Sequence, residues 1–261
     1  MAVYYDQQAE AYLNTRPTYP SDWYSKLASL TPNRTLAWDA GTGNGQAAIG
    51  VAEHYEKVIA TDVSEGQIKH AIPHPKVRYV HTPLSMSEDE LVSLIGGEGS
   101  VDLVTVAVAV HWFDLPSFYS LVNRVLRKPE GIIAVWGYKN FTVDPVFDSV
   151  MKHFIETASP FYNPNIRYIN DSYRTLPFPF ESVGIGSEGN ALIFDLTQEL
   201  SFDEALKELS SWSVVSIAKE QGVDLLFEGI VKELKSAWGD QSNLIKTVNR
   251  KAFMIAGKPR I

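Results

Sequence analysis

The stretch TLAWDAGTGNG, residues 35–45, joins a short apolar run to three glycines that alternate with other residues. Its apolar part predicts a buried strand, and residues 46–54 directly after it predict a helix. Gly41, Gly43 and Gly45 allow backbone dihedral angles closed to other residues and let a ligand approach the main chain. A strand that enters a helix through such a loop is typical of the first unit of a doubly wound α/β sheet.

Apolar runs and amphipathic stretches continue to alternate after this loop. Further strands are expected at 57–62, 77–81, 101–110 and 131–138, and helices at 64–71, 87–95 and 115–126. The run 101–110 (VDLVTVAVAV) is rich in β-branched residues and almost wholly apolar, as expected of a central parallel strand covered on both faces. Strand and helix alternate five times, so we expect an α/β fold with a mostly parallel sheet and helices on both faces.

The pattern changes after residue 138. We expect a helix over 143–158, irregular chain over 160–189, a strand at 190–197, mostly helix over 202–238 and a closing strand at 247–257. The resulting prediction is one domain over 1–261. Its core is 35–138, completed by strands near 190–198 and 244–258, and its cap or lid comes from 1–30 and 145–240.

Composition excludes several classes of protein. The 261 residues carry a formal charge of −8 and no basic run, the wrong sign for a protein that binds nucleic acid through phosphates. No cysteine is present, and His70 and His74 are separated by Pro73, so we expect no metal site. The chain has no window of 18 apolar residues and begins without a leader-like segment, so we expect no membrane partner and a cytoplasmic location. Nothing in the sequence indicates an oligomeric state.

Two aspartates indicate which cofactor the loop holds. Asp62 ends the second expected strand, 17 residues after Gly45, where a carboxylate can bind both hydroxyls of a ribose. A dinucleotide fingerprint needs a small residue where this chain has Gln46. Asp39, just before the loop, repels a pyrophosphate but attracts the sulfonium and ammonium groups of S-adenosylmethionine. The sequence therefore favours S-adenosylmethionine over NAD(P).

Three motifs together resemble a known family. Asp39-x-Gly41-x-Gly43-x-Gly45 followed by Asp62 resembles the cofactor motif of class I S-adenosylmethionine-dependent methyltransferases. Residues 12–20 (YLNTRPTYP) and 109–114 (AVHWFD) resemble segments of the type 11, trans-aconitate methyltransferase-like branch. The resemblance covers about residues 5–138 and implies a Rossmann-like, seven-stranded sheet whose seventh strand is reversed.

The chain departs from this family at two positions. Many relatives carry Gln where Val108 stands, and an acidic residue at the end of the third strand, where this chain reads HTPLS at 81–85. We therefore expect backbone groups of Leu84 and Ser85 to contact the adenine. Arg16 is expected to bind the methionine carboxylate, because an arginine fork matches it. S-adenosylmethionine is the methyl donor of this family. The residues expected to contact this donor are Arg16, Asp39, Ala40, Gly41, Gly43, Asn44, Gly45, Gln46, Asp62, Val63, Gln67, Leu84, Ser85, Ala107 and Val108.

Three residues are candidates for the reaction itself. His111 and Trp112 follow the central strand at the edge where ligands bind in open α/β sheets. His111 can orient the acceptor or take its proton, and Trp112 can face the sulfonium, although both are equally consistent with structural roles. Tyr12 lies one helical turn before Arg16 and can line the same pocket.

The leading hypothesis is a methyltransferase that binds S-adenosylmethionine and releases S-adenosylhomocysteine. The acceptor is expected to be a small molecule, methylated on a carboxylate or hydroxyl oxygen and selected by residues 145–240. The alternatives are an NAD(P)-dependent oxidoreductase and a non-catalytic cofactor-binding protein of the same fold.

Overall fold

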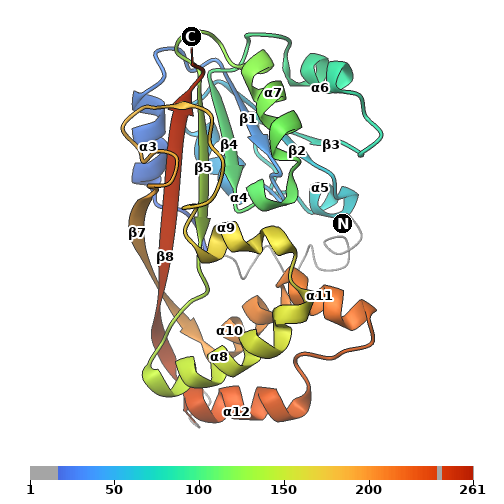
Figure 1. Cartoon of the computed structure of the whole chain (residues 1–261), viewed down its shortest axis with the longest axis vertical. Coiled ribbons are helices and arrows are strands. Elements are labelled where there is room, and N and C mark those ends of the chain that lie inside the picture. The colour runs from blue at the N-terminus through green and yellow to red at the C-terminus, as the bar shows by residue number, and fades with distance from the viewer. Residues whose placement is uncertain (1–16, 240–242, 261) are drawn as a thin grey trace.

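A computed structural model describes residues 17–239 and 243–260 (Figure 1). In this part of the chain, eight strands form one sheet in the order β3-β2-β1-β4-β5-β8-β6, and β7 pairs with β8. The first five strands are parallel: β1 (Leu36–Ala40), β2 (Lys57–Asp62), β3 (Val77–His81), β4 (Leu103–Ala107) and β5 (Ile132–Tyr138). The long strand β8 (Ile245–Lys258) runs antiparallel to β5. The expected Rossmann-like sheet and its reversed strand are confirmed. The described sheet has eight strands rather than the expected seven, because the two-residue strand β6 also pairs with β8.

Helices cover both faces of this sheet. On one face, α3 (Ser21–Ser29) and α4 (Gln46–Ala52) bury apolar residues such as Leu27 and Val51 against the strands. On the other face, α6 (Glu88–Ile95) and α7 (Leu115–Val125) do the same with residues such as Val92 and Val122. Ser87 forms a capping box that starts α6, and Asp114 caps α7. The short helix α5 (Glu65–Lys69) is capped by Ser64.

A second group of helices lies beyond the carboxyl ends of the parallel strands, in the lower half of Figure 1. It consists of α8 (Pro145–Ala158), α10 (Phe202–Ser210), α11 (Ser213–Glu220) and α12 (Glu228–Trp238). The antiparallel pair of β7 (Leu192–Ser201) and β8 extends from the sheet into this group. These elements share a core of their own around Phe147, Phe154 and Trp238, and we call them the helical lobe.

The structure differs from the sequence prediction in three segments. The strand expected over 101–110 ends at Ala107, because Val108 has a φ of 55° and turns the chain into the 3-10 turn η1 (Val110–Trp112). Residues 160–189 are not wholly irregular, since they contain α9 (Arg167–Asn170) and β6 (Glu181–Ser182). The helix α3, part of the expected N-terminal cap, packs on the sheet face. The stretch 202–238 is mostly helical, as predicted, and consists of three helices.

Candidate functional site

A cavity of about 320 Å³ opens at the carboxyl ends of β1, β2 and β4. In a doubly wound sheet this edge is where ligands bind, because the loops that leave adjacent strands diverge there. The first half of its wall comes from the strand ends and α5: Ala40, Gly41, Gly43, Thr61, Asp62, Val63, Gln67, Val108 and Ala109. The second half comes from the segment after β3 and from α6, η1 and α7: Thr82, Pro83, Leu84, Met86, Leu91, Trp112, Phe113 and Phe118. We call this space the donor cavity.

The glycine loop has the conformation that its sequence predicts. Gly41, Gly43 and Gly45 have φ values of 68°, 58° and 98°, which side chains with a Cβ rarely adopt. A Cβ on Gly41 would lie 2.7 Å from the Cβ of Ala109, and one on Gly45 would lie 2.2 Å from the hydroxyl of Tyr79. The bare backbone of the loop is therefore required for packing and leaves room for a ligand beside it.

Asp62 ends β2 and forms part of the wall of the donor cavity. Its Oδ2 accepts a hydrogen bond from the Gly43 N–H at 2.8 Å, and its Oδ1 accepts one from the Ser64 N–H at 2.8 Å. These two bonds hold the carboxylate in one orientation between the glycine loop and α5. A carboxylate oxygen can accept more than one hydrogen bond, so the ribose hydroxyls of a donor remain suitable partners.

Asp39 lies behind the glycine loop and is not part of the cavity wall. It is fully buried, and its carboxylate accepts hydrogen bonds from the hydroxyls of Thr42 (2.5 Å) and Thr105 (2.6 Å). The pKa of Asp39 is raised to about 6: burial is the main cause and the nearby Asp62 adds to it, while the hydrogen bonds from the two threonines oppose the change. Asp39 can therefore act on a cationic ligand through its charge rather than by direct contact.

The donor cavity contains features that fit an adenosyl cofactor. Gln67 is buried in its wall, and its Oε1 has no hydrogen-bond partner among the described residues. A buried acceptor of this kind normally has a partner, so its position suits a donor group on a ligand. Around Leu84 and Met86 the wall is apolar and suits a flat aromatic ring such as adenine.

Nine predicted residues line the donor cavity: Ala40, Gly41, Gly43, Asp62, Val63, Gln67, Leu84, Val108 and Trp112. Six others are not in its wall: Asp39, Asn44, Gly45, Gln46, Ser85 and Ala107. Arg16 and Tyr12 lie outside the described residues. Sequence reasoning missed Met86, Leu91 and Phe118, because their apolar side chains are ordinary for helices and loops. It quoted Phe113 within a motif without assigning it a role.

A second, smaller cavity of about 90 Å³ lies between the sheet edge and the helical lobe. Val108 belongs to the walls of both cavities, so the two are neighbours on either side of this residue. The rest of the smaller cavity's wall comes from η1, the end of β5, the α8–α9 connection, α9 and the helical lobe. Its residues are His111, Tyr138, Asn140, Tyr162, Ile166, Ile169, Glu208, Trp212 and Ser213. We call this space the lobe cavity.

His111 belongs to the lobe cavity and not to the donor cavity. It is buried, and its Nδ1 has no hydrogen-bond partner in the described part of the chain. Burial lowers its pKa to about 4, because desolvation disfavours the charged imidazolium. His111 is therefore neutral at pH 7 and a weaker base than an exposed histidine.

Comparisons with known proteins identify the family. A family model described as a methyltransferase domain matches residues 38–135. A Dictyostelium discoideum protein named as a methyltransferase is 34% identical over 259 residues, which cover 96% of this chain and 92% of that protein. A solved structure from Anaeromyxobacter dehalogenans, described as a type II methyltransferase, has 33% identity and a TM-score of 0.74, covering 93% of this chain and 97% of its own.

A Saccharomyces cerevisiae protein named as an S-adenosylmethionine-dependent methyltransferase is 28% identical over 179 residues, 63% of this chain and 56% of that protein. The chain belongs to the class I S-adenosylmethionine-dependent methyltransferases and is an enzyme of that class. The oxidoreductase and the non-catalytic protein that the sequence left as alternatives are not supported. The resemblance to the trans-aconitate branch stays a prediction.

Two further findings concern metals and membranes. Within residues 17–239 and 243–260, no group of three or more histidines and acidic residues is arranged to hold a metal ion. None of the helices described is both long and apolar enough to cross a bilayer.

Proposed function

We propose that this methyltransferase methylates a small molecule on an oxygen atom of a hydroxyl or a carboxylate. The observation that carries this proposal is the pair of neighbouring cavities at the sheet edge, which share Val108. One is mainly apolar and lies next to Asp62 and Asp39, and the other is small and lined by both polar and apolar side chains. Their sizes suit a nucleoside-like donor and one functional group of a small acceptor, and the acidic chain gives no support to a nucleic-acid acceptor.

The donor cavity would hold S-adenosylmethionine through a few specific contacts. Asp62 would bind the ribose hydroxyls, Gln67 would accept a hydrogen bond, and Leu84 and Met86 would flank the adenine. Trp112 lies in the wall on the side of η1, where its ring can face a cation. When bound, this cofactor supplies a methyl group on a sulfonium, which is a good leaving group.

The chain's own part in the reaction is to orient the acceptor and exclude water. The acceptor oxygen forms its bond to the methyl carbon as the carbon–sulfur bond breaks, and the electron pair of that bond stays on sulfur. A carboxylate acceptor releases no proton. A hydroxyl becomes strongly acidic as it accepts the methyl group, so even a weak base such as neutral His111 can take its proton and pass it to water.

The role of Asp62 is tested by replacing Asp62→Ala and measuring S-adenosylhomocysteine binding by calorimetry. We expect affinity to fall roughly tenfold or more, because hydrogen bonds to a charged group are among the stronger ones. The matched control is Asp114→Asn, an exposed helix cap outside both cavities, which should bind normally. Unchanged affinity in a folded Asp62→Ala protein would contradict this assignment.

The reaction is tested by supplying a methyl-labelled donor with a panel of small hydroxyl compounds and carboxylic acids. Mass spectrometry should detect a methyl ether or a methyl ester of at least one of them. Transfer only to nitrogen or carbon acceptors would contradict the proposal.

A further inference from the structure

The lobe cavity contains a buried ion pair that bears on the choice of acceptor. Glu208 of α10 belongs to its wall, and the Glu208 side chain is only 2% exposed. The Arg250 guanidinium of β8 forms a salt bridge and hydrogen bond with its carboxylate through Nη2 and Oε2. Arg250 also donates from Nη1 to the Oε1 of Gln198 at 3.1 Å and lies over the ring of Phe141. Of this pair, Glu208 belongs to the cavity wall and Arg250 does not.

The other polar groups of this wall are neutral. They belong to His111, Tyr138, Asn140, Tyr162 and Ser213. Among the described residues of the wall there is no lysine or arginine. Because Glu208 and Arg250 compensate each other, the site as a whole carries no net charge that would attract an anion.

A bound carboxylate would lie in this enclosed space next to the Glu208 carboxylate. Burying an anion without a paired cation is strongly unfavourable, and a neighbouring like charge makes it more so. A hydroxyl avoids both penalties, because its O–H can donate to a carboxylate oxygen or to the imidazole of neutral His111. A volume of about 90 Å³ holds roughly six atoms of water size, if each needs about 15 Å³, so the reacting end of an acceptor enters the lobe cavity and the rest of a larger acceptor extends outside it.

We propose that the lobe cavity selects a neutral acceptor group with a hydrogen-bond donor, a hydroxyl or phenol, and rejects carboxylates, with Glu208 as the specificity-determining residue. This inference rests on the proposed function. It keeps the hydroxyl as the acceptor and excludes the carboxylate. The Arg250 partner then has a defined purpose: it pairs with the Glu208 carboxylate and orients it without offering a cation to the substrate.

The test uses two probes with the same carbon skeleton, benzyl alcohol and benzoate, and the full-length protein saturated with S-adenosylhomocysteine. Ligand-observed NMR measures the affinity of each probe at pH 7. The wild-type protein should bind benzyl alcohol at least fivefold more tightly than benzoate. Equal or tighter binding of benzoate, or no binding of benzyl alcohol, overturns the inference.

The charge argument is tested with Glu208→Gln. This change leaves the Arg250 cation without its partner, so the preference should reverse in favour of benzoate. Asp144→Asn is the control, because it removes the carboxylate of another ion pair near the lobe, with Lys246, outside the lobe cavity. It should keep the wild-type preference. An unchanged preference in folded Glu208→Gln overturns the inference.

A buried arginine without a partner can prevent folding, so a second variant is needed. Glu208→Met combined with Arg250→Met removes both charges and should bind the two probes within about twofold of each other. If this variant still rejects benzoate, the ion pair is not the cause and the inference fails. Methylation of carboxylates alone by the wild-type enzyme would also overturn this inference but leave the proposed function intact, whereas no transfer to any oxygen acceptor would contradict both.

Discussion

Asp39 shows how much the surroundings of a single residue change its chemistry. The sequence identifies an acidic residue before a glycine loop and predicts a contact with the cofactor. In the structure this carboxylate is fully buried and bonded to two threonine hydroxyls, with its pKa raised to about 6. Its charge state therefore changes close to neutral pH, which an exposed aspartate would not do.

This pKa predicts a pH dependence of donor binding. The folded protein holds the Asp39 proton more tightly than the unfolded chain, so the carboxylate ionises only as the pH rises through about 6. Over the same pH range, the ionised Asp39 carboxylate attracts the cationic methyl donor, so the affinity for the donor should rise from about pH 5 to pH 7. Calorimetric titrations with S-adenosylmethionine across this range measure the slope. Asp39→Asn should bind weakly at every pH, and a slope that survives this change would assign the effect to another group.

Val108 is strained at the point where the two cavities meet. Its φ of 55° is an outlier for a β-branched residue and costs on the order of 1–3 kcal/mol. Its N–H donates to the Trp136 carbonyl at 2.8 Å, which helps to hold this conformation. Strain at such a place is consistent with a functional constraint on the backbone between donor and acceptor.

Replacing Val108→Asn or Val108→Gly should relieve this strain. We expect either variant to be as stable as the wild type or up to about 1 kcal/mol more stable, since both residues tolerate positive φ. Val108→Ala is the control, because it shortens the side chain but keeps the unfavourable φ. Chemical denaturation measures the difference, and a Gly or Asn variant less stable than the Ala variant would contradict the strain argument.

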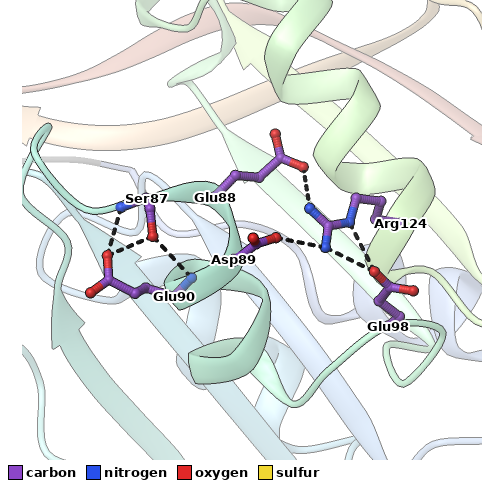
Figure 2. A network of polar contacts seen from close by, with 6 residues as sticks. All are labelled: Ser87, Glu88, Asp89, Glu90, Glu98 and Arg124. Carbon is purple, nitrogen blue, oxygen red and sulfur yellow. Dashed lines mark hydrogen bonds and ion pairs between the residues drawn. The ribbon is translucent and has the colours of Figure 1, made fainter.

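At the scale of elements, α6 is held in place by a network of charges on Arg124 of α7 (Figure 2). The guanidinium contacts Glu88 at 2.6 Å, Asp89 at 2.9 Å and Glu98 at 2.8 Å. These acids raise the pKa of Arg124 above its ordinary value. Because α6 follows the segment with Met86 and itself contributes Leu91, the network also positions one wall of the donor cavity.

Arg124→Met should therefore affect the donor cavity from a distance. We expect faster amide exchange over residues 86–98 and a two- to fivefold loss of S-adenosylhomocysteine affinity. The difference in affinity between Arg124→Met and the wild type should become smaller at high salt, because salt screens the exposed ion pairs of the wild type. Lys232→Met, which breaks an exposed pair with Glu228 on α12, is the control. Unchanged exchange in Arg124→Met would show that packing alone holds α6.

Some elements of this fold were predictable from the sequence and others were not. The five parallel strands and the flanking helices were predictable, because their apolar periodicity reflects burial that each segment brings with it. The strand predicted over 101–110 extends three residues beyond the observed end at Ala107. The positive φ of Val108 ends the strand, and hydropathy does not indicate such a dihedral angle. The stretch 202–238 was predicted as mostly helical and is, but its sequence did not indicate that its three helices share one core with α8.

For the whole molecule, donor binding is expected to stabilise the fold. S-adenosylhomocysteine at a hundred times its Kd should add about 2.7 kcal/mol to the free energy of unfolding. For a chain of this size that corresponds to a rise of roughly 5–10 °C in Tm, measured by calorimetry. NADH at the same concentration should leave Tm unchanged. A shift with NADH but none with S-adenosylhomocysteine would contradict the donor assignment.

The sequence alone determined the class of fold, the conformation of the glycine loop, the place of Asp62 at the end of the second strand, and the preference for a methyl donor over a dinucleotide. These depend on local patterns: periodicity, residues that permit unusual dihedral angles, and a fixed spacing along one βαβ unit. Only the tertiary structure decided that Asp39 is buried, that His111 faces the lobe cavity, and that Glu208 and Arg250 meet. Glu208 and Arg250 are 42 residues apart, on a helix and a strand that pack only after the sheet has formed. No local pattern records such a contact, because its energy exists only in the folded molecule.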